Sequence, residues 1–263
     1  MLQQSQQQVQ TGFCDDPVAA YDRIASVFAR LAEQQRPYLD RIDQLVLSEM
    51  PPESHSLLDV GSGDGARARR IAHTRGVAKL VLLEPSVAMQ GEDRADANVW
   101  TMRAEELRSV QAEFDVVTCL WNVLGHIFPV QSRIEVLRQF ARLVSPGGAV
   151  FVDVNHRYNA RHYGLLKTTQ RFLRDQVSWD DKNGDVVVCW DGCSTPGHVF
   201  TDKEFRHLCK AAGFRVEKRF VVDYANGQQH RWGWEGNLLY VLRSESPLID
   251  SSRPLQSGPR SGD

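Results

Sequence analysis

Apolar residues in the first fifty positions recur at the spacing of an amphipathic helix. Tyr21, Ile24 and Phe28 follow one another at steps of three and four, which places them on one helical face. Pro17 opens this segment, and Pro37 is expected to divide it into two helices, because proline lacks the N–H that a helix interior needs. A turn-forming stretch at 50–56 then separates the helices from the first strand.

From residue 57 onward, short apolar runs alternate with helical patterns. The runs are nearly continuous in apolar residues, which is typical of strands buried on both faces. Strand and helix alternating at this spacing predicts an α/β fold, with a parallel sheet covered by helices on both faces. The predicted strands are 57–60, 79–84, 98–102, 114–121, 149–155, 214–224 and 237–243; the later helices are 131–144 and 201–214, with a turn at 145–148.

Residues 156–198 interrupt this alternation. A helical piece is followed by two alternating runs around Asn183-Gly184, and this dipeptide is a strong signal for the turn of a β-hairpin. We therefore expect a helix and β-hairpin cap inserted at 156–198 into one domain spanning 17–243. Residues 1–16 are expected to form a flexible leader. The Ser-, Pro- and Gly-rich tail at 244–263 is expected to be disordered.

Composition narrows the class of partner. The chain has 263 residues and a formal net charge of −2, so it lacks the basic surface typical of nucleic-acid binding. Arg67, Arg69 and Arg70 form a local cluster, which we interpret as a solvated helical face. Cys189 and Cys193 are close together, but no second pair has zinc-ligand spacing. All five cysteines are expected to be reduced, in a cytoplasmic protein without a signal peptide or membrane span.

Three glycines follow the first strand, in the sequence LLDVGSGDG. Gly61, Gly63 and Gly65 predict a tight turn between strand and helix, where an adenosine-containing ligand binds in open α/β sheets. A dinucleotide would place its pyrophosphate at the start of the helix. Asp59 and Asp64 would repel that group, whereas they would attract the sulfonium and ammonium of S-adenosylmethionine. The acidic loop therefore favours S-adenosylmethionine over NAD(P).

Glu84 ends the second strand, 84 − 65 = 19 residues after the last glycine. A carboxylate at this place accepts hydrogen bonds from ribose hydroxyls. Enzymes that bind NAD use the same device, so Glu84 predicts an adenosine ligand without choosing between the two. A surface carboxylate starting a turn with Pro85 is the structural alternative.

Several motifs in order resemble the class I S-adenosylmethionine-dependent methyltransferases. AAYDRIA is similar to the N-terminal helix of that family, whose tyrosine often borders the donor. LLDVGSGDG and VLLEPS resemble its first two motifs, MRAEEL its post-third-strand motif, and FDVVTCLWNVLGHI its fourth. LVSPGGAVFVDVN resembles its turn and fifth strand, and FTDKEFRHLCKAAGF followed by two strands resembles its usual ending. The resemblance covers roughly residues 17 to 243.

The resemblance implies a Rossmann-like seven-stranded sheet ordered 3-2-1-4-5-7-6, with the last strand antiparallel. It also implies S-adenosyl-L-methionine as the methyl donor and S-adenosyl-L-homocysteine as the product. Carried over by position, the donor-binding residues are Tyr21, Asp59, Gly61, Ser62, Gly63, Glu84, Pro85, Ala104, Glu105, Leu120 and Asn122.

The fourth motif departs from some members of the family. It lacks Asn-Pro-Pro-Tyr, which would have suggested methylation of amino groups on DNA bases or glutamine. It also lacks an acidic residue, which argues against a catechol-type magnesium site despite Asp153 and Asn155. No metal site is therefore expected. No Pro-Cys pair is present to supply a cysteine nucleophile, and Cys119 inside a strand is interpreted as packing.

The acceptor side should be built by the segment after the fourth strand and by the insertion. His126, His156 and Tyr158 are the candidate catalytic or acceptor-orienting residues. For the two histidines, capping or core packing is the alternative. Tryptophans gather in the same regions and could form a lid over the acceptor or pack the hairpin. They are Trp121, Trp179, Trp190, Trp232 and Trp234.

We therefore expect methyl transfer to a small-molecule acceptor, in a monomer or homodimer that binds neither nucleic acid nor membrane. Methylation of a peptide, a carrier-bound intermediate or RNA is the alternative within the same fold. An NAD(P)-binding oxidoreductase and a catalytically idle donor-binding protein are the rivals from other classes.

Overall fold

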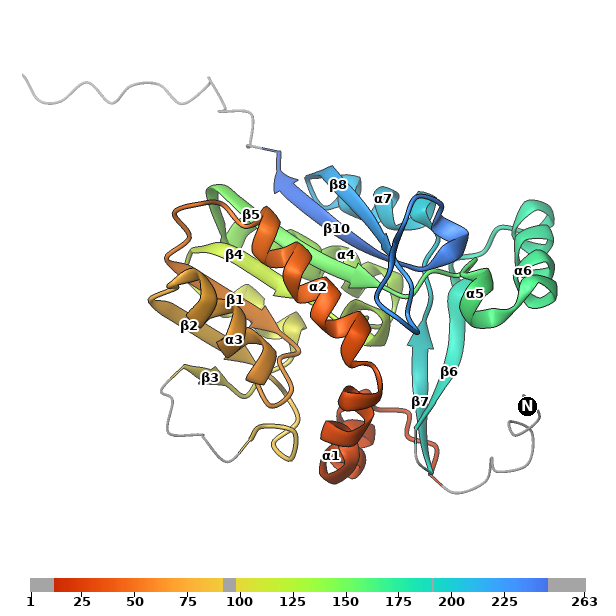
Figure 1. The fold of residues 1–263 in the computed structure, drawn as a ribbon, viewed down its shortest axis with the longest axis horizontal. Coiled ribbons are helices and arrows are strands. Elements are labelled where there is room, and N and C mark those ends of the chain that lie inside the picture. Colours follow the sequence, from red (N-terminus) through yellow and green to blue (C-terminus); the bar gives the residue numbers. More distant parts are fainter. Residues whose placement is uncertain (1–11, 92–97, 191, 246–263) are drawn as a thin grey trace, which may run out of the picture.

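The computed structural model describes residues 12–91, 98–190 and 192–245, and Figure 1 shows its fold. Within these residues, one sheet has the strand order β3-β2-β1-β4-β5-β10-β8-β9 and a second sheet pairs β6 with β7. The strands of the large sheet are β1 (Ser56–Val60), β2 (Lys79–Leu83), β3 (Val99–Trp100), β4 (Phe114–Cys119), β5 (Val144–Val154), β8 (Phe214–Val222), β9 (Gln229–His230) and β10 (Asn237–Ser244).

The direction of the strands confirms the expected topology. β1 runs parallel to β2 and β4, and β4 runs parallel to β5, whereas β10 is antiparallel to both β5 and β8. This is the order 3-2-1-4-5-7-6 with the last strand reversed. The described sheet has one more strand than expected, because the two-residue β9 pairs with the end of β8.

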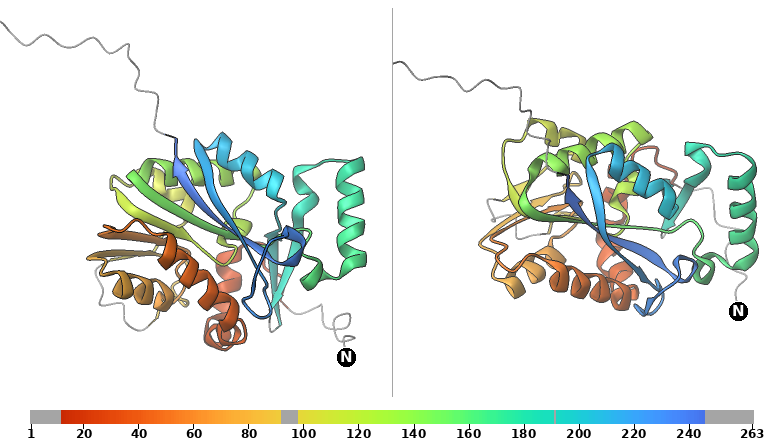
Figure 2. Two further views of the ribbon diagram at one scale, coloured as in Figure 1. Left: turned by 45° about the horizontal axis from the view of Figure 1, so that its top comes forward. Right: turned by 90° about the horizontal axis from the view of Figure 1, so that it is seen from above.

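Helices cover both faces of the sheet (Figure 2). Successive side chains of a strand point to opposite faces, so Leu57 packs under one layer of helices and Leu58 under the other. One layer contains α2 (Arg36–Glu49) and α3 (Ala66–Arg75). The other contains α4 (Val130–Leu143) and α7 (Asp202–Ala211), whose first turn carries the predicted capping box. None of the described helices is long and apolar enough to cross a membrane.

The first helical segment divides where expected. α1 spans Pro17–Gln34, and α2 begins with Arg36 and Pro37, so the second helix carries its proline in the first turn. The predicted turn at 145–148 lies inside β5 instead, where it appears as an irregularity in the pairing with β4. Gly147 has a φ of +80° there, which lets the strand bulge and then resume its register.

The insertion folds as a helix and β-hairpin unit, which we call the cap although none of its described residues lines the cavity described below, and its hairpin turns elsewhere than predicted. Asn183 and Gly184 lie in the one-turn helix η3 (Asp181–Gly184), and the paired strands are β6 (Asp185–Trp190) and β7 (Cys193–His198). The chain therefore reverses between residues 190 and 193. Tertiary packing explains the error, because Gly184 lies against Arg157 and His198 with no room for a side chain.

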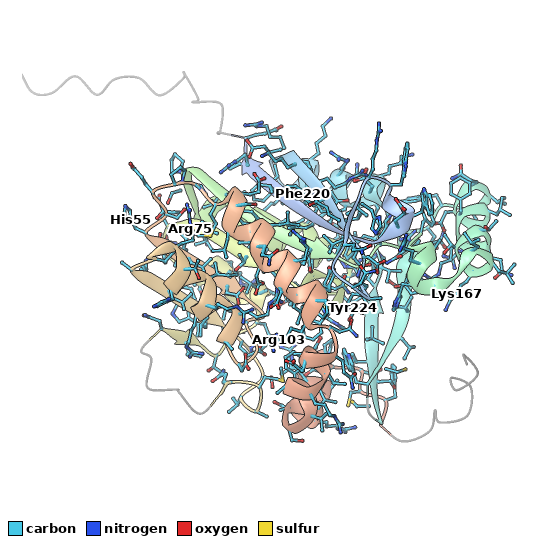
Figure 3. The ribbon with its side chains drawn as sticks, viewed as in Figure 1. His55, Arg75, Arg103, Lys167, Phe220 and Tyr224 are labelled. Atoms are coloured by element: carbon cyan, nitrogen blue, oxygen red, sulfur yellow. The ribbon has the colours of Figure 1, made fainter. Side chains whose placement is uncertain are left out.

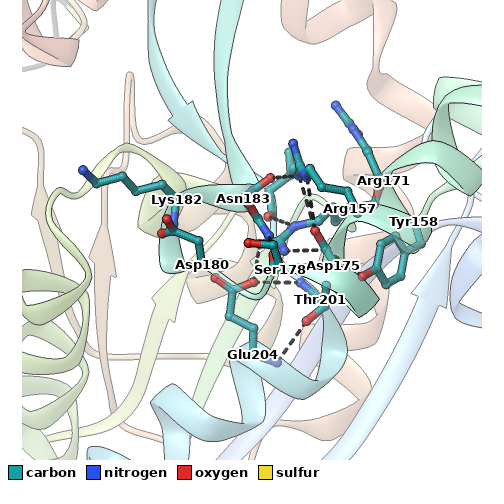
Figure 4. A network of polar contacts seen from close by, with 12 residues as sticks. Arg157, Tyr158, Arg171, Asp175, Ser178, Asp180, Lys182, Asn183, Thr201 and Glu204 are labelled. Atoms are coloured by element: carbon teal, nitrogen blue, oxygen red, sulfur yellow. Dashed lines mark hydrogen bonds and ion pairs between the residues drawn. The ribbon is translucent and has the colours of Figure 1, made fainter.

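Buried charges tie this cap to the main domain (Figure 4). The Arg157 guanidinium is fully buried and contacts Asp175 of α6 (Leu165–Val177) at 2.8 Å and Glu204 of α7 at 2.5 Å. His198 bridges Glu204 and Asp185, at 2.7 Å from each. Removing one partner from a buried network leaves an uncompensated charge, so these contacts fix the cap against α7. The short helix α5 (Ala160–Tyr163) precedes α6.

Part of the predicted leader is packed against the same cap. Cys14 is buried, its N–H donates to the carbonyl of Ser194 in β7 at 2.8 Å, and Phe13 forms a parallel bridge with Ser194. Residues 12–16 therefore follow β7 before α1 begins, in contrast to the expected flexible segment. The rest of the leader and all but two residues of the predicted tail lie outside the described residues.

Candidate functional site

A cavity of about 380 Å³ lies where β1, β2 and β4 end, beneath α1. This volume falls within the range of small-molecule sites, about 300–1,000 Å³. Ten of the eleven predicted donor-binding residues line it, together with one of the three predicted catalytic residues. They are Tyr21, Asp59, Gly61, Ser62, Gly63, Glu84, Pro85, Ala104, Glu105, Leu120 and His126.

The glycine turn forms the floor of the cavity. Gly61 and Ser62 both donate backbone hydrogen bonds to the Leu83 carbonyl at the end of β2, at 2.8 and 3.1 Å. Gly61 has a φ of +72°, and a Cβ there would lie 2.5 Å from the Val123 side chain. Gly63 has a φ of +58°. Only glycine adopts these conformations without strain, so the sequence fixes a turn that brings backbone to the cavity surface.

Asp59 lies in β1 directly before its last residue and is only 8% exposed. Its Oδ1 accepts a 2.6 Å hydrogen bond from the Thr118 hydroxyl. Burial raises the pKa of Asp59 from 3.8 to about 6, and the Thr118 hydrogen bond opposes that effect only in part. An opposite charge nearby stabilises an ionised carboxylate. Asp59 therefore suits a cationic ligand better than an anionic one.

Glu84 follows β2 and is held in place by backbone donors. Its Oε2 accepts a hydrogen bond from the Gly63 N–H and its Oε1 accepts one from the Ser86 N–H, both at 2.9 Å. Burial raises the pKa of Glu84, while these two hydrogen bonds act in the opposite direction. A carboxylate has about four lone-pair positions, so each oxygen can accept one further donor from a ligand.

His126 reaches the cavity wall from η2 (Val123–His126), the short helix after β4. Its Nδ1 lies 3.0 Å from the Pro196 carbonyl of β7, and its Nε2 lies 3.3 Å from the Tyr21 hydroxyl. Because a carbonyl only accepts, the network assigns the proton to Nδ1 and a lone pair to Nε2. Burial lowers the pKa of His126 to about 4; the Pro196 contact opposes this shift and the Arg133 charge adds to it.

Aromatic rings surround this pair. The Tyr21 ring centroid lies 5.0 Å from that of Trp190 and 6.2 Å from that of Phe28, and Phe28 in turn lies 5.3 Å from Trp121. Of the five tryptophans expected in a lid, Trp121 lines the cavity, and Trp190 does not line it but packs against the lining residues Tyr21 and His126. The other three, Trp179, Trp232 and Trp234, are about half exposed and do not line it.

The structure does not bring His156, Tyr158 or Asn122 to the cavity. The His156 ring is buried, and its Nδ1 donates to the Gly233 carbonyl at 2.8 Å. The Tyr158 hydroxyl donates to Asp175 at 2.6 Å, within the network that anchors the cap.

Asn122 has a structural place instead of a position in the cavity wall. It adopts a φ of +59°, and its N–H donates to the Asp153 carboxylate at 2.8 Å. Its side-chain carbonyl accepts the Asn155 N–H at 2.9 Å. Its side chain therefore connects the end of β4 to the end of β5. For this reason its position in the fourth motif did not predict its place correctly, and it does not line the cavity.

Several lining residues were not predicted. Phe28 and Met89 border Gly63, and Arg103 precedes the predicted adenine-side pair 104–105. Phe28 lies two helical turns after Tyr21 on the same face, so its spacing was a usable signal. Arg103, labelled beside α1 in Figure 3, forms a 2.7 Å ion pair with Asp16, the N-cap of α1. That contact joins segments distant in the sequence and left no local signal.

The outer end of the cavity is charged. Arg67 and Arg70 of α3 both line it, and each contacts Asp43 of α2 at 2.6 Å. The interpretation as a solvated face is therefore wrong for Arg67, whose side chain is 21% exposed, whereas the Arg70 side chain remains 51% exposed. Among the described residues, no group of three His, Cys, Asp or Glu side chains is arranged to hold a metal ion.

Comparison with known proteins agrees with this geometry. The methyltransferase-domain family matches residues 30–219. The chain is 32% identical to the ubiquinone biosynthesis O-methyltransferase of Aeromonas salmonicida over 250 residues, which cover 88% of this chain and 94% of that protein. It is also 32% identical over 113 residues to a dTDP-4-amino-2,3,4,6-tetradeoxy-D-glucose N,N-dimethyltransferase of Saccharopolyspora spinosa, covering 42% of this chain and 44% of that enzyme.

Solved structures share the fold. The CcbJ methyltransferase of Streptomyces caelestis superposes with a TM-score of 0.62 at 16% identity, covering 86% of this chain and 97% of that one. CalS10 of Micromonospora echinaspora, an amino pentose methyltransferase solved with S-adenosylmethionine bound, gives a TM-score of 0.52 at 16% identity, covering 84% and 96%.

Proposed function

This chain belongs to the class I S-adenosylmethionine-dependent methyltransferases, and we propose that it methylates a small-molecule acceptor by direct in-line displacement. The observation that carries the proposal is the cavity itself, which places Asp59, the glycine turn and Glu84 along one wall and the uncharged base His126 at the end of η2. Bound S-adenosylmethionine supplies an activated methyl group on a sulfonium.

The residues present fit this donor. Ser62 Oγ is buried and finds no hydrogen-bond partner among the described residues, as expected for an atom that a ligand satisfies. A Cβ on Gly63 would point between Phe28 and Met89, at 3.6 and 3.5 Å from their nearest carbons. The space that glycine leaves there would therefore be lost to any larger residue.

Each part of the wall has a proposed role in holding the donor. Glu84 would accept the ribose hydroxyls, and Ala104 and Glu105 would flank the adenine. Asp59 would attract the cationic methionine portion, directly or through water, and the turn at Gly61 would give that portion close access to backbone. Alignment of a nucleophile with the methyl–sulfur bond can supply on the order of 7–11 kcal/mol of the barrier.

The same groups argue against a dinucleotide. Asp59 and Glu84 are both buried carboxylates at the glycine turn, and a pyrophosphate placed beside them would add like charge in a poorly solvated site. An NAD(P)-dependent oxidoreductase is therefore disfavoured.

A small acceptor is favoured over a macromolecule because α1 covers part of the site. Tyr21 of this helix contacts His126 and Trp190 from the cap side. The named activities of the two curated relatives above, an O-methyltransferase and a sugar N,N-dimethyltransferase, also act on small molecules. Together these names support oxygen or nitrogen as the methylated atom without choosing one.

Transfer of tritiated methyl from labelled donor into a metabolite extract, followed by mass spectrometry of the labelled product, tests the proposal. We expect one or a few small labelled products with the native protein and much less label with Glu84→Ala. Calorimetry should show binding of S-adenosylhomocysteine and none of NADH. Tight NADH binding with no response to S-adenosylhomocysteine would refute the proposal. Label found only in protein or RNA would show that the methyl acceptor is a macromolecule.

A further inference from the structure

Tyr21 and His126 form a hydrogen-bonded pair that joins α1 to η2. They are 105 positions apart in the chain, and their contact joins the Tyr21 hydroxyl to His126 Nε2. The proton on His126 Nδ1 is held by the Pro196 carbonyl, so Nε2 can only accept. The Tyr21 hydroxyl must therefore be the donor of this bond. The Pro196 carbonyl of β7 thus decides that Tyr21 donates and His126 accepts in this hydrogen bond.

The lone pairs of the Tyr21 oxygen are not used by this bond. Both side chains line the cavity, and rings on two sides hold the phenol in place. Burial, with a smaller contribution from the charge of Glu84, raises the pKa of Tyr21 well above its usual value. The group is therefore a neutral phenol that donates to His126 and can accept one hydrogen bond from a bound molecule.

We propose that Tyr21 is a catalytic residue that accepts the proton of a hydroxyl acceptor while passing its own proton to His126. The inference rests on the proposed methyl transfer and narrows the acceptor to a phenol or alcohol. Tyr21 then does more than border the donor, because its oxygen would touch the reacting hydroxyl.

The step balances in atoms and charge. The acceptor oxygen forms a bond to the methyl carbon as the methyl–sulfur bond breaks, and the bonding electrons stay on sulfur. The acceptor proton moves to the Tyr21 oxygen, and the Tyr21 proton moves to His126 Nε2. The positive charge lost by the sulfonium appears on the imidazole ring. The site therefore carries the same net charge before and after transfer, which favours protonation of a histidine that otherwise stays neutral.

The pair points to oxygen because of what each acceptor requires. A phenol or alcohol holds its proton at neutral pH, and its oxygen becomes a strong nucleophile only as that proton leaves. An amine can lose its proton to water before it binds, and its neutral nitrogen then needs no base. A base with a fixed tautomer, connected to the cavity through a phenol, is therefore useful to a hydroxyl acceptor and dispensable for an amine.

Kinetic variants test the relay. Tyr21→Phe keeps the ring and removes only the hydroxyl, and His126→Gln removes the base. Tyr163→Phe is the matched control, because Tyr163 lies on α5 and does not line the cavity. We expect kcat for tritium transfer into the extract to fall about 100-fold or more in both test variants. Affinity for S-adenosylhomocysteine should stay within about threefold.

The double variant separates a relay from two independent effects. Residues that act as one unit lose their contribution together, so the Tyr21→Phe, His126→Gln pair should be no slower than the slower single variant. A normal rate in Tyr21→Phe would overturn the inference. So would losses that multiply in the double variant, or transfer by the native protein to amines alone.

A second readout does not depend on the acceptor. In nitrogen-15 NMR of the protein with S-adenosylhomocysteine bound, the His126 ring should be the tautomer protonated at Nδ1. The Nε2 resonance should move in Tyr21→Phe and stay unchanged in Tyr163→Phe. A proton on Nε2, or an Nε2 resonance indifferent to Tyr21→Phe, overturns the relay. If the native protein labels nothing, the proposed function fails, while this spectrum still decides whether the pair exists as described.

Discussion

Replacing Glu84 by alanine is expected to weaken donor binding by about 30- to 1,000-fold. The structure shows why this carboxylate is well placed. Its two oxygens already accept the N–H groups of Gly63 and Ser86, which fixes the carboxylate plane and leaves one lone-pair position on each oxygen. Both remaining positions are available to the two ribose hydroxyls of the donor.

The size of the expected loss in affinity follows from the negative charge of the Glu84 carboxylate. A hydrogen bond to a charged group contributes about 1.5–3 kcal/mol. Two bonds to one carboxylate are not additive, so we expect a loss of about 2–4 kcal/mol, which corresponds to the stated range in affinity. Glu84→Gln should lose less, since its amide oxygen remains an acceptor. It must nevertheless disturb one of the two backbone contacts, because the amide NH₂ cannot accept.

Glu84→Ala also removes a partner of the glycine turn, so the raw loss mixes two effects. Comparing S-adenosylhomocysteine with its 2′-deoxy analogue in both proteins separates them. The effect on the turn is common to both ligands and cancels in the double-mutant cycle. By calorimetry, the deoxy analogue should bind the native protein much more weakly than the parent ligand. In Glu84→Ala the two ligands should bind almost equally.

Glu113→Ala serves as the control, because this exposed carboxylate precedes β4 outside the cavity. It should bind both ligands as the native protein does. If the penalty for the missing hydroxyl is the same in the native protein and in Glu84→Ala, the carboxylate does not contact the ribose. The assignment made from the end of β2 would then be refuted.

Three further predictions concern the turn, the buried acid and the cap. Gly63→Val should abolish S-adenosylhomocysteine binding in calorimetry while circular dichroism shows a folded protein, since a branched side chain is strained at a φ of +58°; normal binding would exclude the turn from the site. In the ligand-free protein, Asp59 should contribute a downward slope to stability, a loss of about 3 kcal/mol as pH rises from about 4 to about 6, because it holds a proton more tightly when folded than its usual pKa of 3.8 allows. Asp59→Asn should flatten that slope in urea titrations and weaken donor binding, and an unchanged slope would contradict the raised pKa. Arg157→Met should lower stability by about 3–5 kcal/mol, because Asp175 and Glu204 lose their buried partner; a loss under about 1 kcal/mol in the same titrations would show that water reaches the network.

Local sequence patterns predicted a feature correctly wherever that feature depends on a single stretch of chain. Asp59 and Glu84 end neighbouring parallel strands, and parallel strands bring their carboxyl ends to one edge of the sheet. The glycine turn needs positive φ at 61 and 63 whatever packs around it. These features made this wall of the cavity predictable. The same reasoning failed for Asn122, because its motif position does not reveal that Asp153 and Asn155 would engage its polar groups.

The sequence by itself determined the alternation of strands and helices, the split of the first helices and the wall that would hold the donor, because periodicity and glycine placement act over a few residues. The strand order followed from the resemblance to the family and not from periodicity. Tertiary structure decided what depends on distant partners. It moved the hairpin turn away from Asn183, since Gly184 is packed against Arg157. It also joined Tyr21 to His126 at the cavity wall and fixed the tautomer through a carbonyl of the cap. Such contacts require several elements to meet, and no local pattern records which side chains will face one another when they do.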